Sequence, residues 1–269
     1  MPRAHSNDLD TENAADWQRR VVGRSLRTAA ERSVDRGNAL IRAAATVLER
    51  SNGEDITVQE VADEAGQSLR TLYQYFESKD DLLLAVFEEA MRTYAQLIRN
   101  AITDLEDPVE RLAGAMVAAV SMPAFSNSGL DRGLARLRLK LSEVQPELVG
   151  RAQQAVTTLI RDLVEAAASA KRIRVDDAES ATFVLLALNA AYITTERLGN
   201  DAGVRRPDIQ GIVTFCLRGL DADLKPGWFD AISARLRLPT RRPKFGAAAT
   251  GNGRRRATRA SKRAPTRKP

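Results

Sequence analysis

Apolar residues recur every three or four positions through the middle of the chain, and this spacing constrains the fold more than any other feature. It is seen in Ile41, Ala44, Ala45 and Leu48, and again in Val58, Val61, Ala62 and Ala65. Residues three and four apart lie on one face of an α-helix. The sequence has no run of alternating β-branched residues that would indicate a half-buried strand. We therefore expect an all-α fold, with the folded part over residues 37–222.

Capping residues mark the ends of the first helices. Asn38 is expected to cap a first helix that ends near residues 52–53. Thr57, with Glu60 three residues later, forms a capping box that opens a short second helix. Gly66 is expected to end that helix, because glycine favours the position just after a helix C-terminus.

Serine and proline mark the later boundaries. Ser68 is placed to cap a third helix, and Ser78 a fourth that continues beyond Arg99. Further breaks are expected at residues 107–108, 122–123, 145–146, 176–177 and 206–207. This division gives about nine or ten helices. The stretch Lys225–Leu238 could add one more amphipathic helix packed on the core.

One Cys and one His among 269 residues exclude several classes of protein. A single Cys cannot form an internal disulfide, and one His cannot supply a zinc cluster or a Cys/His catalytic pair. We find no other set of acid, base and nucleophile residues in the sequence that indicates a catalytic site. We therefore expect no metal, no cofactor and no enzymatic activity.

The sequence also lacks the marks of membrane insertion and secretion. The uncharged stretch Ser180–Thr195 has 16 residues, fewer than the roughly 20 apolar residues of a spanning helix. Asp8, Asp10 and Glu12 occupy the place of a signal peptide's apolar segment. We expect a soluble, cytoplasmic protein with no membrane partner.

Charge is divided unevenly along the chain. Residues 240–269 hold eleven Lys or Arg and no acid, so residues 1–239 carry thirty basic against thirty-five acidic groups. The tail is poor in large apolar residues, and we expect it to be disordered. Residues 1–36 are polar and Arg-rich, and are expected to form a flexible or partly helical arm.

Residues 57–81 carry the most informative pattern, two short helices joined by a turn at Gly66 and Gln67. This is the helix-turn-helix layout of DNA-binding proteins. In the second helix Leu72 and Phe76 are four residues apart and are expected to face the core. The other side chains remain on its N-terminal or outer surface, where they can enter a major groove.

The chemistry of these outward residues suits DNA. Arg70 can read guanine O6 and N7, Gln74 can pair with adenine, and Leu69 or Thr71 can touch a thymine methyl group. Donors that reach phosphates set register without reading sequence. The full set of expected DNA-binding residues is Thr57, Ser68, Leu69, Arg70, Thr71, Tyr73, Gln74, Tyr75 and Lys79.

The stretch from Ile56 to Phe87 resembles the DNA-binding region of the TetR family of one-component regulators. That family's signature runs through A-x-x-A-G, a serine, T-L-Y-x-Y-F, a Ser-Lys pair and a D-L-L continuation. The chain supplies Ala62, Ala65, Gly66, Ser68, Thr71, Leu72, Tyr73, Tyr75, Phe76, Ser78, Lys79, Asp81, Leu82 and Leu83 in that order. The resemblance implies a three-helix DNA-binding domain joined by a connecting helix to a larger helical domain for ligand binding and dimerisation.

Two features depart from the family pattern. Gln67 stands where a small apolar residue is usual, so packing or a polar contact there is expected to differ. Residues 37–88 hold four basic against ten acidic groups, an unusual balance for a domain that meets phosphates. We infer that the Arg-rich arm and the basic tail supply the attraction, the arm by reaching a minor groove. For the tail, a solvated charged end or binding to anionic lipid are the alternatives.

The second half of the chain offers candidate ligand contacts. They are the residues that interrupt or shape its apolar pattern: Met116, Met122, Phe125, Leu137, Leu141, Phe183, Asn189 and Tyr192. Core packing is the alternative for each of them. Asn189 is the most suggestive, because a buried amide needs a partner. Cys216, between Phe215 and Leu217, is expected to be a small buried hydrophobe rather than a redox sensor.

These patterns divide the chain into four parts and lead to one expected function. The parts are an arm at 1–36, a helix-turn-helix domain at 37–88, a ligand-binding and dimerisation domain at 89–238, and a basic tail at 239–269. We expect a homodimeric repressor that binds double-stranded DNA at a palindromic operator and is released by an apolar or amphipathic small molecule. The alternative is a sequence-tolerant, nucleoid-type DNA-binding protein that acts through its basic ends.

Overall fold

The computed structural model describes residues 16–51, 54–121, 129–198 and 207–239, and within these ranges all regular structure is helical. The helices are α1 (Asp16–Arg50), α2 (Val58–Ala65), α3 (Leu69–Tyr75), α4 (Lys79–Ala101), α5 (Pro108–Ser121), α6 (Gly129–Val144), α7 (Pro146–Ala152), α8 (Gln154–Ser169), α9 (Ala178–Leu198), α10 (Ile209–Gly219) and α11 (Trp228–Ser233). The all-α prediction is confirmed, with one or two more helices than the sequence indicated. The expected break at residues 122–123 and the tail at 240–269 lie outside the described residues.

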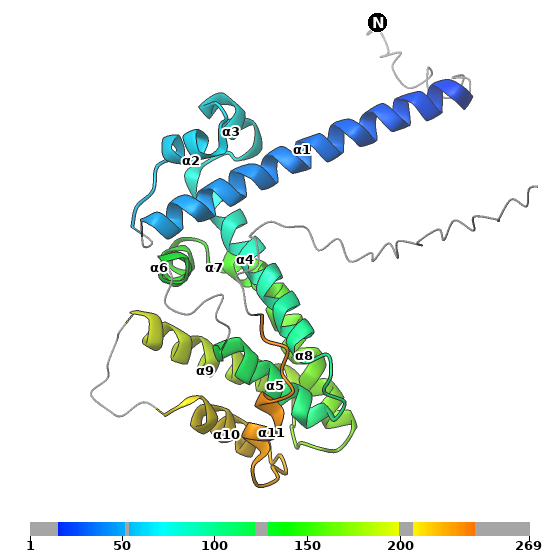
Figure 1. Ribbon diagram of the computed structural model, residues 1–269, viewed down its shortest axis with the longest axis vertical. Coiled ribbons are helices and arrows are strands. Elements are labelled where there is room, and N and C mark those ends of the chain that lie inside the picture. Colours follow the sequence, from blue (N-terminus) through cyan, green and yellow to red (C-terminus); the bar gives the residue numbers. More distant parts are fainter. Residues whose placement is uncertain (1–15, 52–53, 122–128, 199–206, 240–269) are drawn as a thin grey trace, which may run out of the picture.

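The helices form two regions joined by α4. Figure 1 shows α2 and α3 beside the C-terminal half of α1 at one end of the molecule, and α5, α8, α9, α10 and α11 gathered at the other. Helix α4 starts next to the α2–α3 pair and runs into the larger group. Helix α6 packs against both α1 and α9, so it bridges the two regions as well.

The arm expected at residues 1–36 is helical from residue 16 onward, which is the second of its two expected forms. Helix α1 is continuous over 35 residues and passes through Asn38, which therefore caps nothing. Residues 38–50 pack on the core and provide a helical nucleus. Adding residues to an existing helix costs little, and residues 16–36 contain no proline to stop it. The arm has no apolar periodicity, so nothing in the sequence indicated how far its helix would extend.

The capping box of α2 is confirmed. The Thr57 hydroxyl accepts a hydrogen bond from the Glu60 amide at 3.2 Å, and the Glu60 carboxylate accepts one from the Thr57 amide at 2.7 Å. These hydrogen bonds from Thr57 lower the pKa of Glu60. Gly66 ends the helix with φ 61°, in the left-handed region where glycine is favoured.

The caps of the next two helices are confirmed too. Ser68 accepts from the Thr71 amide at 3.1 Å and starts α3. Ser78 accepts from the Asp81 amide at 3.1 Å and starts α4. In return the Asp81 carboxylate accepts from the Glu77 amide at 3.0 Å. These hydrogen bonds fix the start of α3 and the end of the turn that leads into α4.

Later boundaries agree with the sequence in most places. Helix α5 begins at Pro108, α7 begins at Pro146, and the Asp208 side chain caps α10 by accepting from the Gly211 amide at 2.7 Å. The break between α7 and α8 at Gln153 was missed, because no proline or glycine marks it. Of the stretch Lys225–Leu238, only six residues form a helix, α11.

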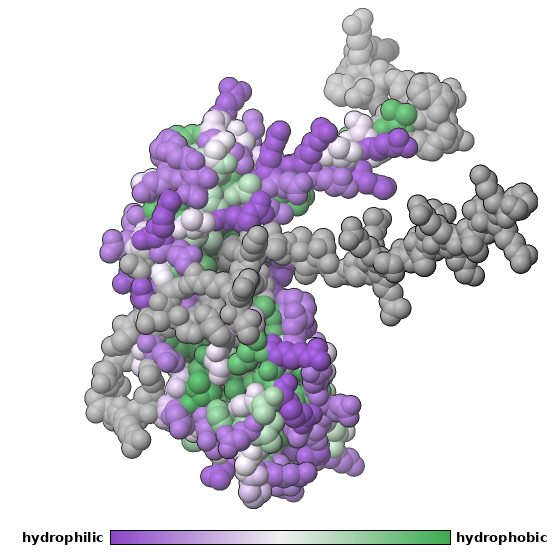
Figure 2. All heavy atoms as spheres, viewed as in Figure 1, coloured by the Kyte–Doolittle hydropathy of each residue, from purple (hydrophilic) through white to green (hydrophobic). Residues whose placement is uncertain are grey.

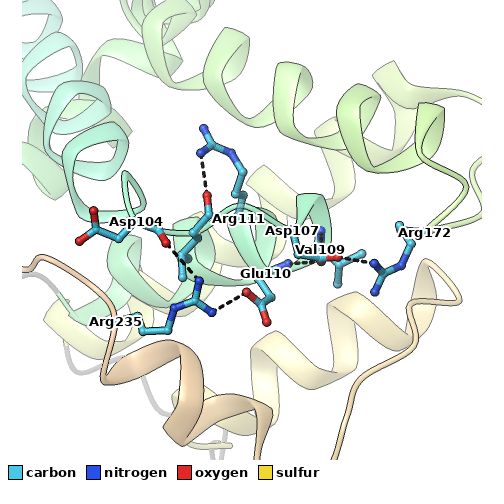
Figure 3. Close-up of polar contacts among 8 residues, drawn as sticks. Asp104, Asp107, Val109, Glu110, Arg111, Arg172 and Arg235 are labelled. Atoms are coloured by element: carbon cyan, nitrogen blue, oxygen red, sulfur yellow. Dashed lines mark hydrogen bonds and ion pairs between the residues drawn. The ribbon is translucent and has the colours of Figure 1, made fainter.

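Residues 228–239, here called the C-terminal strap, close over the corner between α4 and α5. The Arg235 guanidinium donates to the Glu110 carboxylate at 2.7 Å and to the Asp104 carbonyl at 3.1 Å, as Figure 3 shows. The Arg237 amide donates to the Ala101 carbonyl at 2.9 Å. The end of α4 and the start of α5 are thus held by the last described part of the chain.

Asp107 links the same corner to α8. Its carboxylate caps α5 by accepting from the Val109 amide at 2.9 Å and the Glu110 amide at 3.1 Å. The same side chain forms an ion pair with Arg172, which follows α8. One carboxylate therefore sets the start of α5 and its distance from the end of α8.

Gly114 gives a test of how closely the strap packs. A Cβ atom at this position would lie 2.5 Å from Leu105 Cδ1 and 3.1 Å from Leu236 Cδ2. Leu105 is fully buried, so moving its side chain aside would disturb its neighbours in a close-packed core. We expect Gly114→Val to lower the free energy of unfolding by about 2 kcal/mol through overpacking, measured by urea denaturation.

Gly150→Val is the matched control, because nothing lies within 4 Å of a Cβ atom built at Gly150 on α7. We expect its stability to stay within about 0.5 kcal/mol of the wild type. Equal stability of the two variants would show that the strap leaves room for a side chain above α5.

Candidate nucleic-acid interface

The short helix α3 is anchored by its inner face. Leu72 has no exposed surface and Phe76, its C-cap, is also buried. Both belong to the same core cluster as Val61 of α2, with Ala65 and Ile41 packed against that cluster. The predicted inward orientation of Leu72 and Phe76 is therefore confirmed, and the opposite face of α3 is left outside.

The outer face of α3 presents the side chains expected to read bases. Arg70, Tyr73 and Gln74 are exposed, Tyr73 by 53%, while Leu69 and Thr71 are half-exposed. Among the described residues, Arg70 has no hydrogen-bonding or ion-pairing partner. Its guanidinium is therefore available for a contact outside the chain.

The other basic groups of this domain are engaged differently. Arg50 Nη1 lies 2.8 Å from the Glu64 carboxylate. Lys79, at the start of α4, donates from Nζ to Asp55 Oδ1 at 2.6 Å. This hydrogen bond and the positive charge of Lys79 lower the pKa of Asp55. The expected phosphate contact Lys79 is thus held by a carboxylate of its own domain.

Two of the hydroxyl groups predicted to bind DNA also stabilise the first turns of helices. The Ser68 hydroxyl lies 2.9 Å from the Thr71 hydroxyl and caps α3. The Thr57 hydroxyl donates to the Glu60 carboxylate at 2.8 Å. Ser68 and Thr57 are exposed, so each could also meet a duplex, but each is needed first to start its helix.

Tyr75 lies at the joint between α3 and α1. Its hydroxyl accepts a hydrogen bond from Ser33 Oγ at 3.4 Å, and its ring lies 3.5 Å from the position a Cβ atom would take on Gly37. The ring is half-buried. Tyr75 therefore fixes the C-terminal end of α3 against α1, in addition to any phosphate contact.

Gln67 occupies a position that usually favours an apolar side chain. The Gln67 backbone amide donates to the Ala62 carbonyl at 2.9 Å, and the Gly66 backbone amide donates to the Asp63 carbonyl at 3.1 Å. This is the hydrogen-bond pattern of a Schellman motif. The side-chain oxygen of Gln67 is buried without a hydrogen-bond partner. A buried polar atom of this kind costs about 1–3 kcal/mol. The departure noted in the sequence therefore has a local energetic cost.

The candidate ligand contacts fall into three groups. Met116 of α5, Leu137 and Leu141 of α6, and Tyr192 of α9 are buried. Helix α9 packs against both α5 and α6, so these four lie on elements that meet. The Tyr192 hydroxyl also donates to the Pro207 carbonyl at 3.2 Å.

The remaining candidates differ. Asn189 is half-buried on α9, and Phe183 is 73% exposed on the same helix, so the structure does not bring Phe183 to the buried group. Met122 and Phe125 lie outside the described residues. Cys216 is buried, and this burial raises the pKa of its thiol, as expected of a cysteine used as a hydrophobe.

The described residues hold no metal cluster and no spanning helix. No group of three or more His, Cys, Asp or Glu side chains among them lies close enough to hold a metal ion. No helix in the described ranges combines the length and the apolar character needed to cross a bilayer.

Comparison with known proteins agrees with the geometry of this region. Residues 40–86 match the family described as "Bacterial regulatory proteins, tetR family". Over 84 residues the chain is 36% identical to the HTH-type transcriptional regulator HbdR of Aromatoleum sp. (strain CIB). The aligned region makes up 31% of this chain and 37% of HbdR. It is 34% identical over 91 residues to the HTH-type regulator BetI of Brucella anthropi, covering 34% of the chain and 47% of BetI. The chain thus spans less than half of these relatives.

Solved structures resemble a larger part of the chain. RolR in complex with resorcinol superposes with a TM-score of 0.56 at 20% identity, covering 78% of this chain and 98% of RolR. FadR of Bacillus subtilis in complex with stearoyl-CoA gives a TM-score of 0.52 at 21% identity, covering 70% and 98%. These similarities show a shared fold. The predicted resemblance to the TetR family is confirmed for the helix-turn-helix segment.

The Asp55–Lys79 pair predicts an effect on DNA affinity. Asp55→Asn removes the carboxylate that holds Lys79 and leaves the ammonium free for a phosphate. Because an exposed ion pair contributes about 0.2–1 kcal/mol, we expect affinity for any duplex to rise by less than about fivefold. Titration of a labelled duplex at low salt measures this change.

Glu54→Gln is the control, because it removes the same charge from the neighbouring exposed residue without touching Lys79. We expect Asp55→Asn to strengthen binding more than Glu54→Gln does. Equal effects of the two variants would mean that Asp55 acts only through its charge and does not withhold Lys79.

Proposed function

We propose that this chain, whose residues 40–86 belong to the tetR family of bacterial regulatory proteins, is a cytoplasmic, ligand-responsive transcriptional regulator that binds DNA as a homodimer. The observation that carries the proposal is α3, with its inner face buried and an unpaired Arg70 on its outer face. A helix held in this way can enter a major groove without disturbing the core.

Roles on the duplex follow from side-chain chemistry. Arg70 reads guanine, Gln74 reads adenine, and Leu69 or Thr71 contacts a thymine methyl group. The groups with hydroxyl or ammonium donors hold phosphates and set the register. These phosphate-binding residues are Thr57, Ser68, Tyr73, Tyr75 and Lys79. Lys79 must exchange Asp55 for a phosphate to do so.

The proposed dimer interface is the outer surface of α9 and α10. Phe183 and Val184 of α9 are 73% and 51% exposed, and Phe215 of α10 is 67% exposed. These exposed apolar side chains lie on two helices that both pack against α5, and large exposed apolar side chains mark an interaction surface. Pairing these helices with their copies across a twofold axis makes a four-helix interface and gives two recognition helices for a palindromic operator.

Regulation is proposed to act through α4. This helix is continuous from Lys79, next to α3, to Ala101, under the strap, and it packs against α5 and α8 on the way. An effector that favours one position of α4 changes the separation of the two recognition helices by population shift. RolR and FadR were solved with resorcinol and stearoyl-CoA, which supports an apolar or amphipathic effector. Release from DNA when the effector binds, that is, repression, is part of the proposal.

Arg70→Ala tests the base-reading role. We expect it to cost about 1–3 kcal/mol on a duplex selected by the wild-type protein from a random pool, and to relax the choice of base at one position. Competition binding against unrelated DNA measures both effects. Arg50→Ala is the charge-matched control, because Arg50 lies outside α3 and pairs with Glu64.

Equal weakening of Arg70→Ala on selected and unrelated DNA would refute base reading. It would favour the second candidate, a nucleoid-type protein that owes its binding to basic ends. The eleven basic groups of the tail are the observation that favours this candidate, since such groups bind any duplex.

The dimer proposal has its own test. Phe183→Glu and Phe215→Glu each place a charge in the proposed apolar interface, and we expect either to convert the dimer to a monomer in sedimentation velocity. Leu139→Glu on α6 is the control, because Leu139 is also exposed but lies on another helix. Dimers that persist in both phenylalanine variants would place the interface elsewhere.

A further inference from the structure

The N-terminal half of α1 projects from the rest of the molecule. This segment, residues 16–36, is here called the α1 extension. Figure 1 shows it running past α2 and α3 without another helix beside it. Every described side chain from residue 21 to residue 36 is exposed, except Thr28, which is half-exposed. Most of this surface is hydrophilic (Figure 2).

The apolar residues of the α1 extension do not suit a protein partner. Val21, Leu26 and Val34 are its large exposed apolar side chains. At 3.6 residues per turn, Val21 lies about 140° around the helix from both Leu26 and Val34. A partner helix needs an apolar stripe on one face, and these residues do not form one.

The charges of the α1 extension suit a polyanion. Arg24, Arg27, Arg32 and Arg36 are exposed, and no hydrogen bond or ion pair joins them to another described residue. Arg24 and Arg27 are three residues apart and Arg32 and Arg36 are four apart. These four arginines outnumber the acids beside them, Glu31 and Asp35, so this segment carries a net positive charge that phosphates would neutralise.

The α1 extension begins beside the recognition helix. Ser33 donates its hydroxyl to Tyr75, the last residue of α3, and the Tyr75 ring lies against Gly37. From residue 32 to residue 16 the helix continues for about 25 Å at 1.5 Å per residue. This length corresponds to about seven base pairs at 3.4 Å per step.

We propose that the α1 extension is a second DNA-contacting element, which lies along the duplex flanking the site read by α3 and binds its phosphates through Arg24, Arg27, Arg32 and Arg36. The inference rests on the proposed function. It gives the Arg-rich arm expected from the sequence a helical form and a contact with the backbone of the duplex. A helix about 10 Å wide cannot enter a minor groove about 6 Å wide, so the contacts are to the backbone and carry no sequence preference.

The test uses two duplexes and a fourfold variant. Both duplexes carry the sequence selected by the wild-type protein; one has ten further base pairs on each side and the other is trimmed to the selected sequence. We expect the wild type to bind the long duplex more tightly. Substituting all four arginines by Gln should remove that preference and weaken binding to the long duplex about tenfold. The slope of log affinity against log salt concentration should also become shallower, by about one for each phosphate that the variant no longer binds.

Two further variants separate charge from helical structure. Glu31→Gln with Asp35→Asn removes the acids of the α1 extension, and we expect stronger binding to the long duplex only. Ala30→Pro keeps all charges but interrupts the helix, and we expect it to lose most of the preference for the long duplex. Circular dichroism confirms the helix content of each protein.

The outcomes distinguish this inference from the proposed function. A fourfold variant that binds both duplexes like the wild type would overturn the inference and leave the α1 extension as a solvated helix. Base discrimination lost in Arg70→Ala would still support the regulator in that case. A fourfold variant that changes the oligomeric state and not DNA affinity would also overturn the inference, in favour of a protein partner.

Discussion

The buried contact of Leu72 and Phe76 with α1 and α2 is the interaction on which the rest depends. Helix α3 has seven residues, too few to be stable alone in water. Its outward side chains can be displayed only because its inner face is part of the core and Ser68 fixes its first turn. The outer side chains, apart from the capping hydroxyl groups, are then not needed to stabilise the fold and are available to bind DNA.

Two long helices extend this small domain in different directions. Helix α4 carries it into the larger helical region, where Asp107, Arg235 and Arg237 hold the corner after α4 in place. Any displacement of α4 would therefore have to break several polar contacts at its C-terminal end and disturb a packed core at its N-terminal end. Helices held at both ends have a small set of discrete positions, and this property suits a switch.

The sequence predicts features that local chemistry decides. The capping box at Thr57, the caps at Ser68 and Ser78, and the helix starts at Pro108 and Pro146 all depend on residues a few positions apart. Long-range contacts were not accessible. No pattern predicted that Asp55 would meet Lys79, that Phe183 would face outward, or that residues 228–239 would cross the α4–α5 corner. The extent of the α1 extension was not predicted, because a helix can propagate from a packed neighbouring segment without a core of its own.

The distribution of charge suggests a division of labour in DNA binding. The helix-turn-helix domain is acidic overall, and two of its four basic residues, Arg50 and Lys79, pair with its own carboxylates. An acidic domain of this kind gains little from a random duplex, so in the proposed function its binding depends on the base contacts of Arg70. The α1 extension and the basic tail are proposed instead to attract any phosphate backbone. Sequence reading and phosphate attraction are thus assigned to different segments. The recognition surface then has a low affinity for non-specific DNA, and the long-range attraction comes from segments outside it.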